Sequence, residues 1–337
     1  MKKNIKIAVL GGGLWGTVLA QHLGSAGSKR NVWLWEFFAQ AAEILRSKRR
    51  HPHIPGLRLD DAVTVTAHLG QAVAGAEILL FVLPSPVVRT TAKAVRKYLG
   101  RPRPFVVNAS KGLEPGTLKT MGEALVSELP GARAVYTLSG PSFAREVAGG
   151  VPTKMLLAGP RGPQAESLRR LFNGGALRVE LSGDRKGVEL GGSLKNALAI
   201  GCGVLDGLGG RGANTRAALL TQGMEEISRL IVRSGGKLET IYGLAGLGDL
   251  IATGTSPQSR NRAFGEKLGR GKTLQQARRE IPTVVEGVEA AAGAHALSRK
   301  LGLRLPLLEA VWKVVHRGKP ARLVEEALGF NQHGKKR

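Results

Sequence analysis

The first half of the chain alternates short apolar runs with longer segments whose polar and apolar positions fit helices. The first apolar run, 5–10, is bounded by charged residues and by glycines, as a buried strand would be. Regular alternation of strand and helix is typical of a parallel, doubly wound sheet with helices on both faces. The predicted strands are 5–10, 31–35, 63–66, 78–83, 105–108, 134–138, 154–158 and 176–180.

After about residue 187 the strand pattern stops and helical periodicity takes over. A chain of 337 residues is long for one domain. We therefore predict an α/β protein in which a Rossmann-type sheet domain, 1–185, precedes an all-α domain, 186–332. The predicted helices are 189–205, 216–234, 274–281, 287–301, 306–317 and 320–328, and the polar segments 243–249 and 256–262 are expected to be irregular.

The first predicted strand ends in a glycine-rich motif, G-x-G-x-x-G, formed by Gly11, Gly13 and Gly16. In a strand–turn–helix context the first glycine makes the turn, the second admits a pyrophosphate, and the third allows close helix packing. Glu36 ends the next strand about 20 residues later, where an acidic side chain can bind ribose hydroxyls. The motif predicts a dinucleotide site; the alternative is a glycine turn that binds nothing.

Residues 190–205 are apolar or small except for Ser193, Asn196 and one charge, Lys195. A lysine at a helix start can cover apolar surface with its stem and keep its ammonium in water. Alternatively, burial and a neighbouring charge make a lysine able to exchange its proton, as a general base must. Cys202, the single cysteine, lies in the same run and is expected to be inert packing.

Small polar turns follow several predicted strands, and ligands of doubly wound sheets bind beyond these carboxyl ends. Lys111 and the turn 139–142 are therefore candidates for a place beside the cofactor, although each could be an ordinary loop. In the second half, Asp249 has apolar neighbours and is expected to need a cationic or amide partner. Arg260 and Asn261 could hold a phosphate, or Arg260 could form only a surface ion pair.

The formal net charge is +25, yet basic residues are spread along the whole chain and aromatic residues make up 4% of it. This pattern favours a solvated surface that attracts anionic ligands over a specific nucleic-acid site. The uncharged span that begins at Ile7 is interrupted by glycines, so we interpret it as a strand and turn rather than a signal peptide or membrane span. With no disulfide possible within the chain and no His/Cys cluster, we expect a cytoplasmic protein without a metal site.

Several motifs together resemble the NAD(P)-dependent glycerol-3-phosphate dehydrogenases of the soluble bacterial type. The resemblance extends from residue 5 to about residue 328. The motifs are GGGLWGTVLA (11–20), NASKG (108–112), LSGPSFAREVAGGVPT (138–153), VELGGSLKNALAI (188–200), GLAGLGDLIATGTSPQSRNRAFG (243–265) and VVEG (284–287).

The resemblance implies a Rossmann domain and a 6-phosphogluconate-dehydrogenase-like helical substrate domain, with catalysis between them. It also implies interconversion of dihydroxyacetone phosphate and sn-glycerol 3-phosphate for phospholipid synthesis, with Lys195 as proton acceptor or donor. Asn196 and Asp249 fall in active-site motifs. Substrate positions are Lys111, Gly140, Ser142, Lys195, Asp249, Ser259, Arg260 and Asn261; cofactor positions are Gly11, Gly13, Leu14, Trp15, Gly16, Glu36, Phe37, Lys111, Ala144, Arg260, Val284 and Glu286.

Two positions depart from the family pattern. Leu14 stands where bacterial relatives usually carry a small polar residue, and Phe37 stands where they often carry Arg or His. Because Glu36 would repel a 2′-phosphate and Phe37 cannot neutralise one, NAD is the expected cofactor in preference to NADP. Lys48 or Arg49 would be the first place to look for a charge that accommodates NADP.

We also expect a homodimer whose partners are small molecules. The alternative function is a non-catalytic, dinucleotide-sensing regulator on the same fold; a nucleic-acid binder would be the third possibility.

Overall fold

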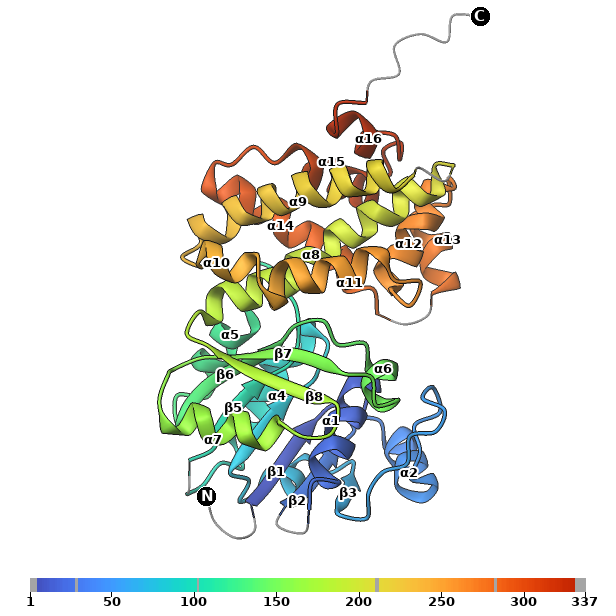
Figure 1. Ribbon diagram of the computed structural model, residues 1–337. Helices are drawn as coiled ribbons and strands as arrows, with labels where there is room; N and C mark the ends of the chain where they lie inside the picture. The colour runs from blue at the N-terminus through green and yellow to red at the C-terminus, as the bar shows by residue number, and fades with distance from the viewer. Residues whose placement is uncertain (1–4, 28–29, 102, 210–211, 282–283, 331–337) are drawn as a thin grey trace, which may run out of the picture. The chain divides into compact units, whose positions relative to one another are not determined.

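The computed structural model describes residues 5–27, 30–101, 103–209, 212–281 and 284–330 (Figure 1). The chain divides into two compact units. The sheet unit comprises Met1–Lys111 and Lys119–Arg185, and the helical unit comprises Gly112–Leu118 and Lys186–Arg337.

The sheet unit contains one eight-stranded sheet in the order β3-β2-β1-β4-β5-β6-β7-β8. Strands β1 to β6 are parallel and carry the 3-2-1-4-5-6 order of a dinucleotide-binding fold. This confirms the predicted fold class. The strands are β1 (Ile5–Leu10), β2 (Arg30–Trp35), β3 (Val63–Thr66), β4 (Ile78–Phe81), β5 (Phe105–Asn108), β6 (Ala134–Ser139), β7 (Thr153–Ala158) and β8 (Leu177–Ser182).

The prediction of an all-parallel sheet was wrong for the last two strands. β7 pairs antiparallel with β6, and β8 runs parallel to β7. A parallel return normally needs a crossover helix long enough to carry the chain back across the sheet. The connection from Ser139 to Thr153 contains only the five-residue helix α6 (Ala144–Ala148), so β7 comes back alongside β6 in the opposite direction.

Alternate strand residues face two separate hydrophobic clusters, which explains why these strands are apolar throughout. In β1, Ile7 and Val9 belong to one cluster, whereas Ala8 and Leu10 belong to the other. The first cluster includes residues from α1 (Leu14–Gly24), α2 (Ala39–Lys48) and α7 (Pro163–Phe172); the second includes residues from α3 (Leu69–Val73), α4 (Ser85–Arg96) and α5 (Met121–Glu128).

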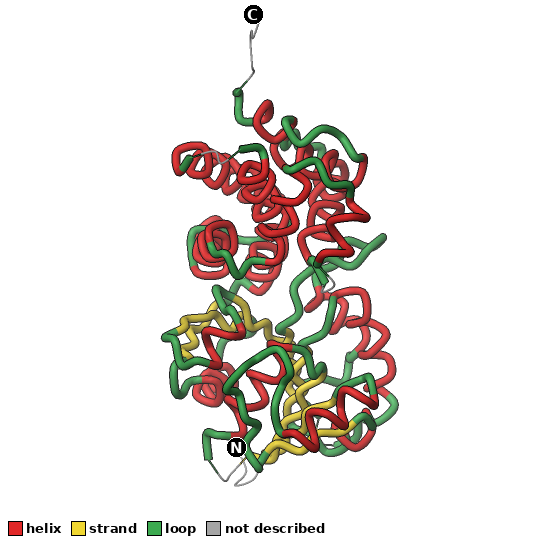
Figure 2. The backbone as a smooth tube through the Cα atoms, turned by 90° about the vertical axis from the view of Figure 1, so that its right-hand side faces the viewer, coloured by secondary structure: helices red, strands yellow, loops and turns green. Residues whose placement is uncertain are grey.

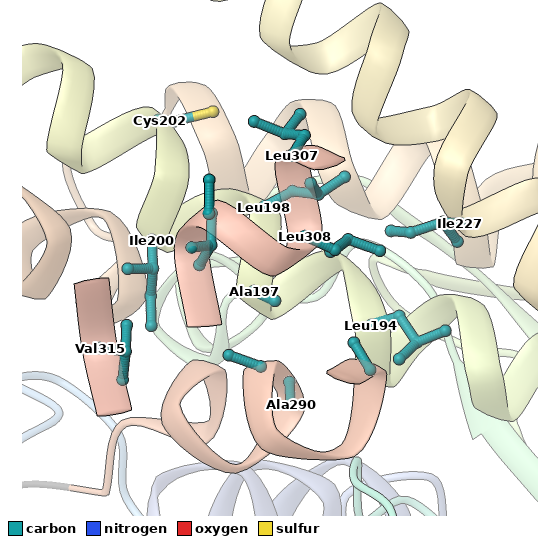
Figure 3. Packing of buried hydrophobic residues seen from close by; sticks show 14 of the residues in the cluster. Leu194, Ala197, Leu198, Ile200, Cys202, Ile227, Ala290, Leu307, Leu308 and Val315 are labelled. Atoms are coloured by element: carbon teal, nitrogen blue, oxygen red, sulfur yellow. The ribbon is translucent and has the colours of Figure 1, made fainter. Parts of the chain in front are cut away.

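The helical unit is organised around α8 (Arg185–Gly207), whose residues are buried without a break from Gly187 to Leu205. Figure 2 shows that helices make up this half of the tube, and Figure 3 shows α8 side chains such as Leu194 and Leu198 packed among those of its neighbours. The other described helices of this unit are α9 (Ala213–Arg233), α10 (Leu238–Ile241), η1 (Leu244–Gly248), α11 (Asp249–Thr255), α12 (Arg260–Gly269), α13 (Leu274–Glu280), α14 (Glu286–Leu301), α15 (Pro306–Arg317) and α16 (Leu323–Ala327).

Glycines bring the backbones of α8 and α12 into direct contact. A β-carbon on Gly203 would lie 1.9 Å from the carbonyl oxygen of Arg262, and one on Gly265 would lie 2.0 Å from that of Ile200. Larger residues at either position would force the helices apart. This contact fixes the first turn of α12, which carries Arg260 and Asn261, against α8.

Of the two segments expected to be irregular, 243–249 is mostly helical, whereas 256–259 is irregular as expected and the rest of the second segment belongs to α12. Residues 244–248 form η1, a π-helical turn in which the amide of Gly248 donates to the carbonyl of Gly243, and α11 follows at Asp249. Ser259 caps α12, which begins at Arg260. Abundant glycine and the short length of these helices hide their periodicity in the sequence. Among the described helices, none combines the length and apolar character that crossing a membrane requires.

Candidate functional site

The glycine-rich loop joins β1 to α1 and requires glycine for two different reasons. Gly11 has φ of 118°, and a β-carbon there would lie 2.4 Å from the carbonyl oxygen of Val82. A β-carbon on Gly16 would lie 1.9 Å from the carbonyl oxygen of Gly11. Gly13 differs, because it is exposed and a β-carbon there would meet no other atom within 4 Å. The structure therefore leaves open space above the second glycine of the motif.

That open space lies at the N-terminus of α1. Gly13 occupies the N-cap position without a capping side chain, and the first turn holds no acidic residue. Unpaired amide groups and the helix dipole make such a terminus suited to a phosphate. Leu14 and Trp15 open the helix and are half-buried, each packed by its apolar side chain. The loop thus fits the pyrophosphate of a dinucleotide.

Glu36, just after β2, is joined to this loop. Its Oε2 accepts a hydrogen bond from the amide of Gly12 at 3.0 Å, and its Oε1 accepts one from the amide of Phe38 at 3.0 Å. Each carboxylate oxygen can accept a further bond. The next side chain, Phe37, is 69% exposed and contacts the edge of Trp35 with 6.1 Å between ring centroids.

A second group of predicted residues meets beyond the carboxyl ends of β5 and β6. The carbonyl oxygen of Gly140 accepts from Nζ of Lys111 at 3.3 Å and from the hydroxyl of Ser142 at 3.1 Å. Gly140 has φ of 140°, which favours glycine, and a β-carbon there would lie 3.1 Å from Cα of Met155. Ala144 begins α6 directly after this turn.

Lys195 lies in the interior of the helical unit and pairs with Asp249. Nζ of Lys195 donates to Oδ1 of Asp249 at 2.7 Å, and the two side chains are only 6% and 3% exposed. Nζ also donates to Oγ1 of Thr253, which in turn donates to the backbone carbonyl of Asp249 at 2.7 Å. The cationic partner expected for Asp249 is therefore Lys195, and the lysine is not a surface residue.

A chain of amide hydrogen bonds runs beside this pair. The amide of Gly287 donates to Oδ1 of Asn261 at 2.9 Å, and Nδ2 of Asn261 donates to Oδ1 of Asn196 at 2.8 Å. Nδ2 of Asn196 donates to Oε2 of Glu286 at 3.3 Å. A β-carbon on Gly287 would lie 2.6 Å from the carbonyl oxygen of Asn196, so glycine permits this close approach of α14 to α8.

The remaining predicted residues lie at helix starts or on the surface of the helical unit. The Ser259 hydroxyl accepts from the amide of Arg262 at 3.2 Å and is buried as the N-cap of α12. Arg260, the first residue of that helix, is exposed. Val284 is 53% exposed. Cys202 is fully buried, and burial raises the pKa of its thiol to about 12, as expected for inert packing.

Two features of this site were not predicted from the sequence. Thr253 completes the surroundings of the Lys195 ammonium, and its spacing of four residues from Asp249 was the available signal, because it places both on one helix face. The π-helical turn η1 immediately precedes Asp249. π-Helical turns occur frequently at functional sites.

Comparisons with known proteins agree with this geometry. The family model described as NAD-dependent glycerol-3-phosphate dehydrogenase N-terminus matches residues 6–163, and the corresponding C-terminus model matches residues 184–325. The NAD(P)+ glycerol-3-phosphate dehydrogenase of Geobacter sulfurreducens is 43% identical over 320 residues, covering 94% of each chain. That of Moorella thermoacetica is 43% identical over 321 residues, covering 95% of this chain and 93% of its own.

A solved structure extends the likeness to three dimensions. The crystal structure of glycerol-3-phosphate dehydrogenase from Coxiella burnetii superimposes with a TM-score of 0.92 and 34% identity, covering 97% of this chain and 99% of its own. These matches confirm the resemblance that the motifs indicated. The chain belongs to the NAD-dependent glycerol-3-phosphate dehydrogenase family.

Proposed function

We propose that this protein interconverts dihydroxyacetone phosphate and sn-glycerol 3-phosphate with a nicotinamide dinucleotide, supplying glycerophospholipid synthesis. The observation that carries the proposal is the buried ion pair of Lys195 with Asp249, 2.7 Å between Nζ and Oδ1. Burying an ammonium costs desolvation free energy that its partner only partly offsets, so a buried ion pair adds little to stability. A functional role is therefore the better explanation for the pair. Proton exchange with a substrate oxygen is that role here.

The dinucleotide, when bound, supplies the hydride that C2 of dihydroxyacetone phosphate receives. The chain's own part is to hold it: the open space over Gly13 and the uncapped N-terminus of α1 would bind the pyrophosphate. Leu14, Trp15 and Ala144 would contact the same dinucleotide. We assign Lys111, Arg260, Val284 and Glu286 to the cofactor as well.

Lys195 supplies the proton that the reduction consumes. As C2 becomes an alcohol, an N–H bond of the ammonium breaks and an O–H bond forms on the substrate, leaving a neutral amine; the reverse direction returns the proton. The Asp249 carboxylate orients the ammonium, and Thr253 helps to fix its position. Asn196 lies next to Lys195 on α8 and belongs to the amide chain, so we assign it a positioning role.

The phosphate of the substrate would bind at the start of α12. Arg260 presents an exposed guanidinium at the first position of a ten-residue helix, where amide groups also favour an anion. Ser259 and Asn261 flank Arg260, and their hydrogen bonds hold the first turn of α12 in place. In the sheet unit, we assign Lys111, Gly140 and Ser142 to substrate contacts, because the carbonyl of Gly140 joins all three.

The proposal is tested by following NADH absorbance with and without dihydroxyacetone phosphate. We expect NADH to be consumed only when the substrate is present, and dihydroxyacetone without its phosphate to be a much poorer substrate. NADH that binds but is not consumed with dihydroxyacetone phosphate would show a dinucleotide-binding regulator instead.

We further propose that NAD is preferred to NADP. The Glu36 carboxylate is bonded to the glycine-rich loop, so it would place negative charge beside the adenosine ribose and repel a 2′-phosphate. The exposed ring of Phe37 offers a stacking surface but no charge. Arg49 is unsuited to compensate, because its guanidinium donates to the backbone carbonyls of Leu59, Asp60 and Val63.

The ratio of kcat/KM for NADH and NADPH, measured at one ionic strength, tests this preference. We expect the ratio to favour NADH and to fall in a Glu36→Gln variant. Equal or better efficiency with NADPH in the unaltered protein would contradict the assignment. In that case exposed Lys48, rather than Arg49, would be the basic residue to replace.

A further inference from the structure

Lys195 lies on α8, and Asp249 directly follows the π-helical turn η1. One turn before these two residues in the chain, the backbones of α8 and η1 come into close contact. Gly191 precedes Lys195 by four residues on α8, and Ala245 precedes Asp249 by four residues in η1. A β-carbon on Gly191 would lie 3.0 Å from the carbonyl oxygen of Ala245 and 3.4 Å from Cα of Gly246. Residues four apart lie on one helix face. The close contact of Gly191 with Ala245 and the ion pair of Lys195 with Asp249 are therefore successive contacts between the same two segments.

The backbone of η1 has little room to move away from α8. A β-carbon on Gly246 would lie 1.9 Å from the carbonyl oxygen of Ile241, which shows that η1 is packed closely on the end of α10. The amide of Gly248 is bonded to the carbonyl of Gly243 across the π-helical turn. Extra volume at Gly191 would therefore displace the backbone of α8 rather than that of η1.

We infer that Gly191 is a positioning residue: its lack of a side chain sets the separation of α8 from η1 and so holds Lys195 Nζ at 2.7 Å from Asp249 Oδ1. This inference rests on the proposed proton-transfer role of Lys195. A β-carbon 3.0 Å from a carbonyl oxygen requires a displacement of a few tenths of an ångström. A misplacement of about 1 Å in a catalytic group can cost roughly 100-fold in rate, so this smaller displacement should cost a smaller factor. A single methyl group at Gly191 is therefore expected to reduce turnover without touching a ligand.

Gly201, on the same helix, provides a matched control. A β-carbon there would lie 3.2 Å from Cγ2 of Val311 and 3.3 Å from Cδ1 of Leu219. Both neighbours are the ends of side chains, which can rotate away, whereas the neighbours of Gly191 are backbone atoms. Replacing either glycine with alanine brings the same gain in helix propensity, about 1 kcal/mol. Only Gly191→Ala must separate two backbones next to the ion pair.

The experiment compares Gly191→Ala and Gly201→Ala, each alone and combined with Asp249→Asn, by kcat, KM for dihydroxyacetone phosphate and melting temperature. We expect Gly191→Ala to lower kcat about three- to tenfold, with KM nearly unchanged because the phosphate contacts are elsewhere. Gly201→Ala should leave both parameters close to those of the unaltered protein. In the Asp249→Asn background, where the ion pair is already lost, Gly191→Ala should have little further effect on kcat.

The inference is overturned if Gly191→Ala keeps normal turnover, or if it lowers kcat by the same factor with and without Asp249. It is also overturned if Gly201→Ala lowers kcat equally, since the effect would then be general loosening of α8. The unaltered protein serves as the test of the proposed function itself. If it does not consume NADH with dihydroxyacetone phosphate, the function fails; if it does and Gly191→Ala is normal, only the role of Gly191 fails.

Discussion

The glycine-rich loop of the sheet unit and the lysine cluster of the helical unit are built from different parts of the chain. The loop offers backbone: glycines that leave space, and amide groups at the start of α1. The cluster offers side chains, Lys195, Asp249 and Thr253, which are buried and bonded to one another. A backbone site tolerates change except at its glycines, whereas a buried charge pair depends on both partners. Variants of Lys195 and of Gly13 therefore test the two kinds of site separately.

Replacing Lys195 with alanine should have the largest effect. Loss of the proton donor should lower kcat by at least about 100-fold, while NADH binding, measured by fluorescence titration, should persist because the glycine-rich loop is in the other unit. The variant should also be less stable, by about 3–5 kcal/mol, because the buried Asp249 carboxylate loses the opposite charge of Lys195.

A double variant, Lys195→Met with Asp249→Asn, separates these two losses. Removing both charges should recover much of the stability without recovering turnover. If the double variant turned over at a normal rate, Lys195 would not be the proton donor.

Replacing Arg260 with alanine should come next, because it removes a charged contact from the proposed phosphate site. We expect KM for dihydroxyacetone phosphate to rise about 10- to 100-fold, the value of a hydrogen bond to a charged group. The matched control is Arg270→Ala at the other end of α12, where the side chain is exposed and pairs with Glu266. An Arg260 variant with unchanged KM would put the phosphate elsewhere.

Replacing Gly13 with alanine tests the backbone site on its own. The free protein has room for the methyl group, so the melting temperature should fall only slightly, by the preference of an N-cap for glycine over alanine. The methyl group would, however, occupy space needed by the dinucleotide. We expect NADH affinity to weaken about tenfold, or about 1.4 kcal/mol. Gly16→Ala is the contrasting variant: its β-carbon would lie 1.9 Å from a carbonyl oxygen, so it should lower stability as well. Normal NADH affinity in Gly13→Ala would exclude the ligand from this loop.

The sequence predicted the sheet unit's loop better than the helical unit's cluster, and the reason is physical. Gly11, Gly13 and Gly16 act through fixed spacing within one turn, so their pattern is visible in contiguous residues. Lys195 and Asp249 are separated by 54 positions and meet only through helix packing. Their chemistry could be suspected from two charges in apolar surroundings, but the pairing could not be read from either segment.

Elements whose geometry depends on tertiary contacts were also hidden. The antiparallel direction of β7 follows from how a short connection is accommodated, and a strand's own residues do not encode its direction. The π-helical turn η1 has no distinctive apolar periodicity, since Leu244–Gly248 contains only leucine, alanine and glycine. Its signal is the close approach that glycine allows, which appears only when the neighbouring helices are in place.

The smallest expected effect on activity concerns Glu226, a buried carboxylate of the helical unit outside the lysine cluster. Its two oxygens accept from the amides of Leu307 and Leu308 at 2.8 and 2.9 Å, at the N-terminus of α15. Burial raises the pKa of Glu226, although these amides oppose the shift. A raised pKa in the folded state means that the folded protein binds the proton more tightly than the unfolded chain does.

Glu226 therefore contributes less stability, relative to a residue that does not titrate, as the pH rises above 4.5, the ordinary pKa of a glutamate. Urea denaturation at several pH values between about 4.5 and 7 should show the difference in unfolding free energy, unaltered protein minus Glu226→Gln, decreasing by about 1.4 kcal/mol for each unit by which the pKa is raised. Glu225→Gln, at the exposed neighbouring position, is the control and should show no such trend. Because Glu226 binds the start of α15 rather than the lysine cluster, kcat should stay near normal in Glu226→Gln. A difference in unfolding free energy that grows with pH would mean that the amides of α15, and not burial, govern this carboxylate.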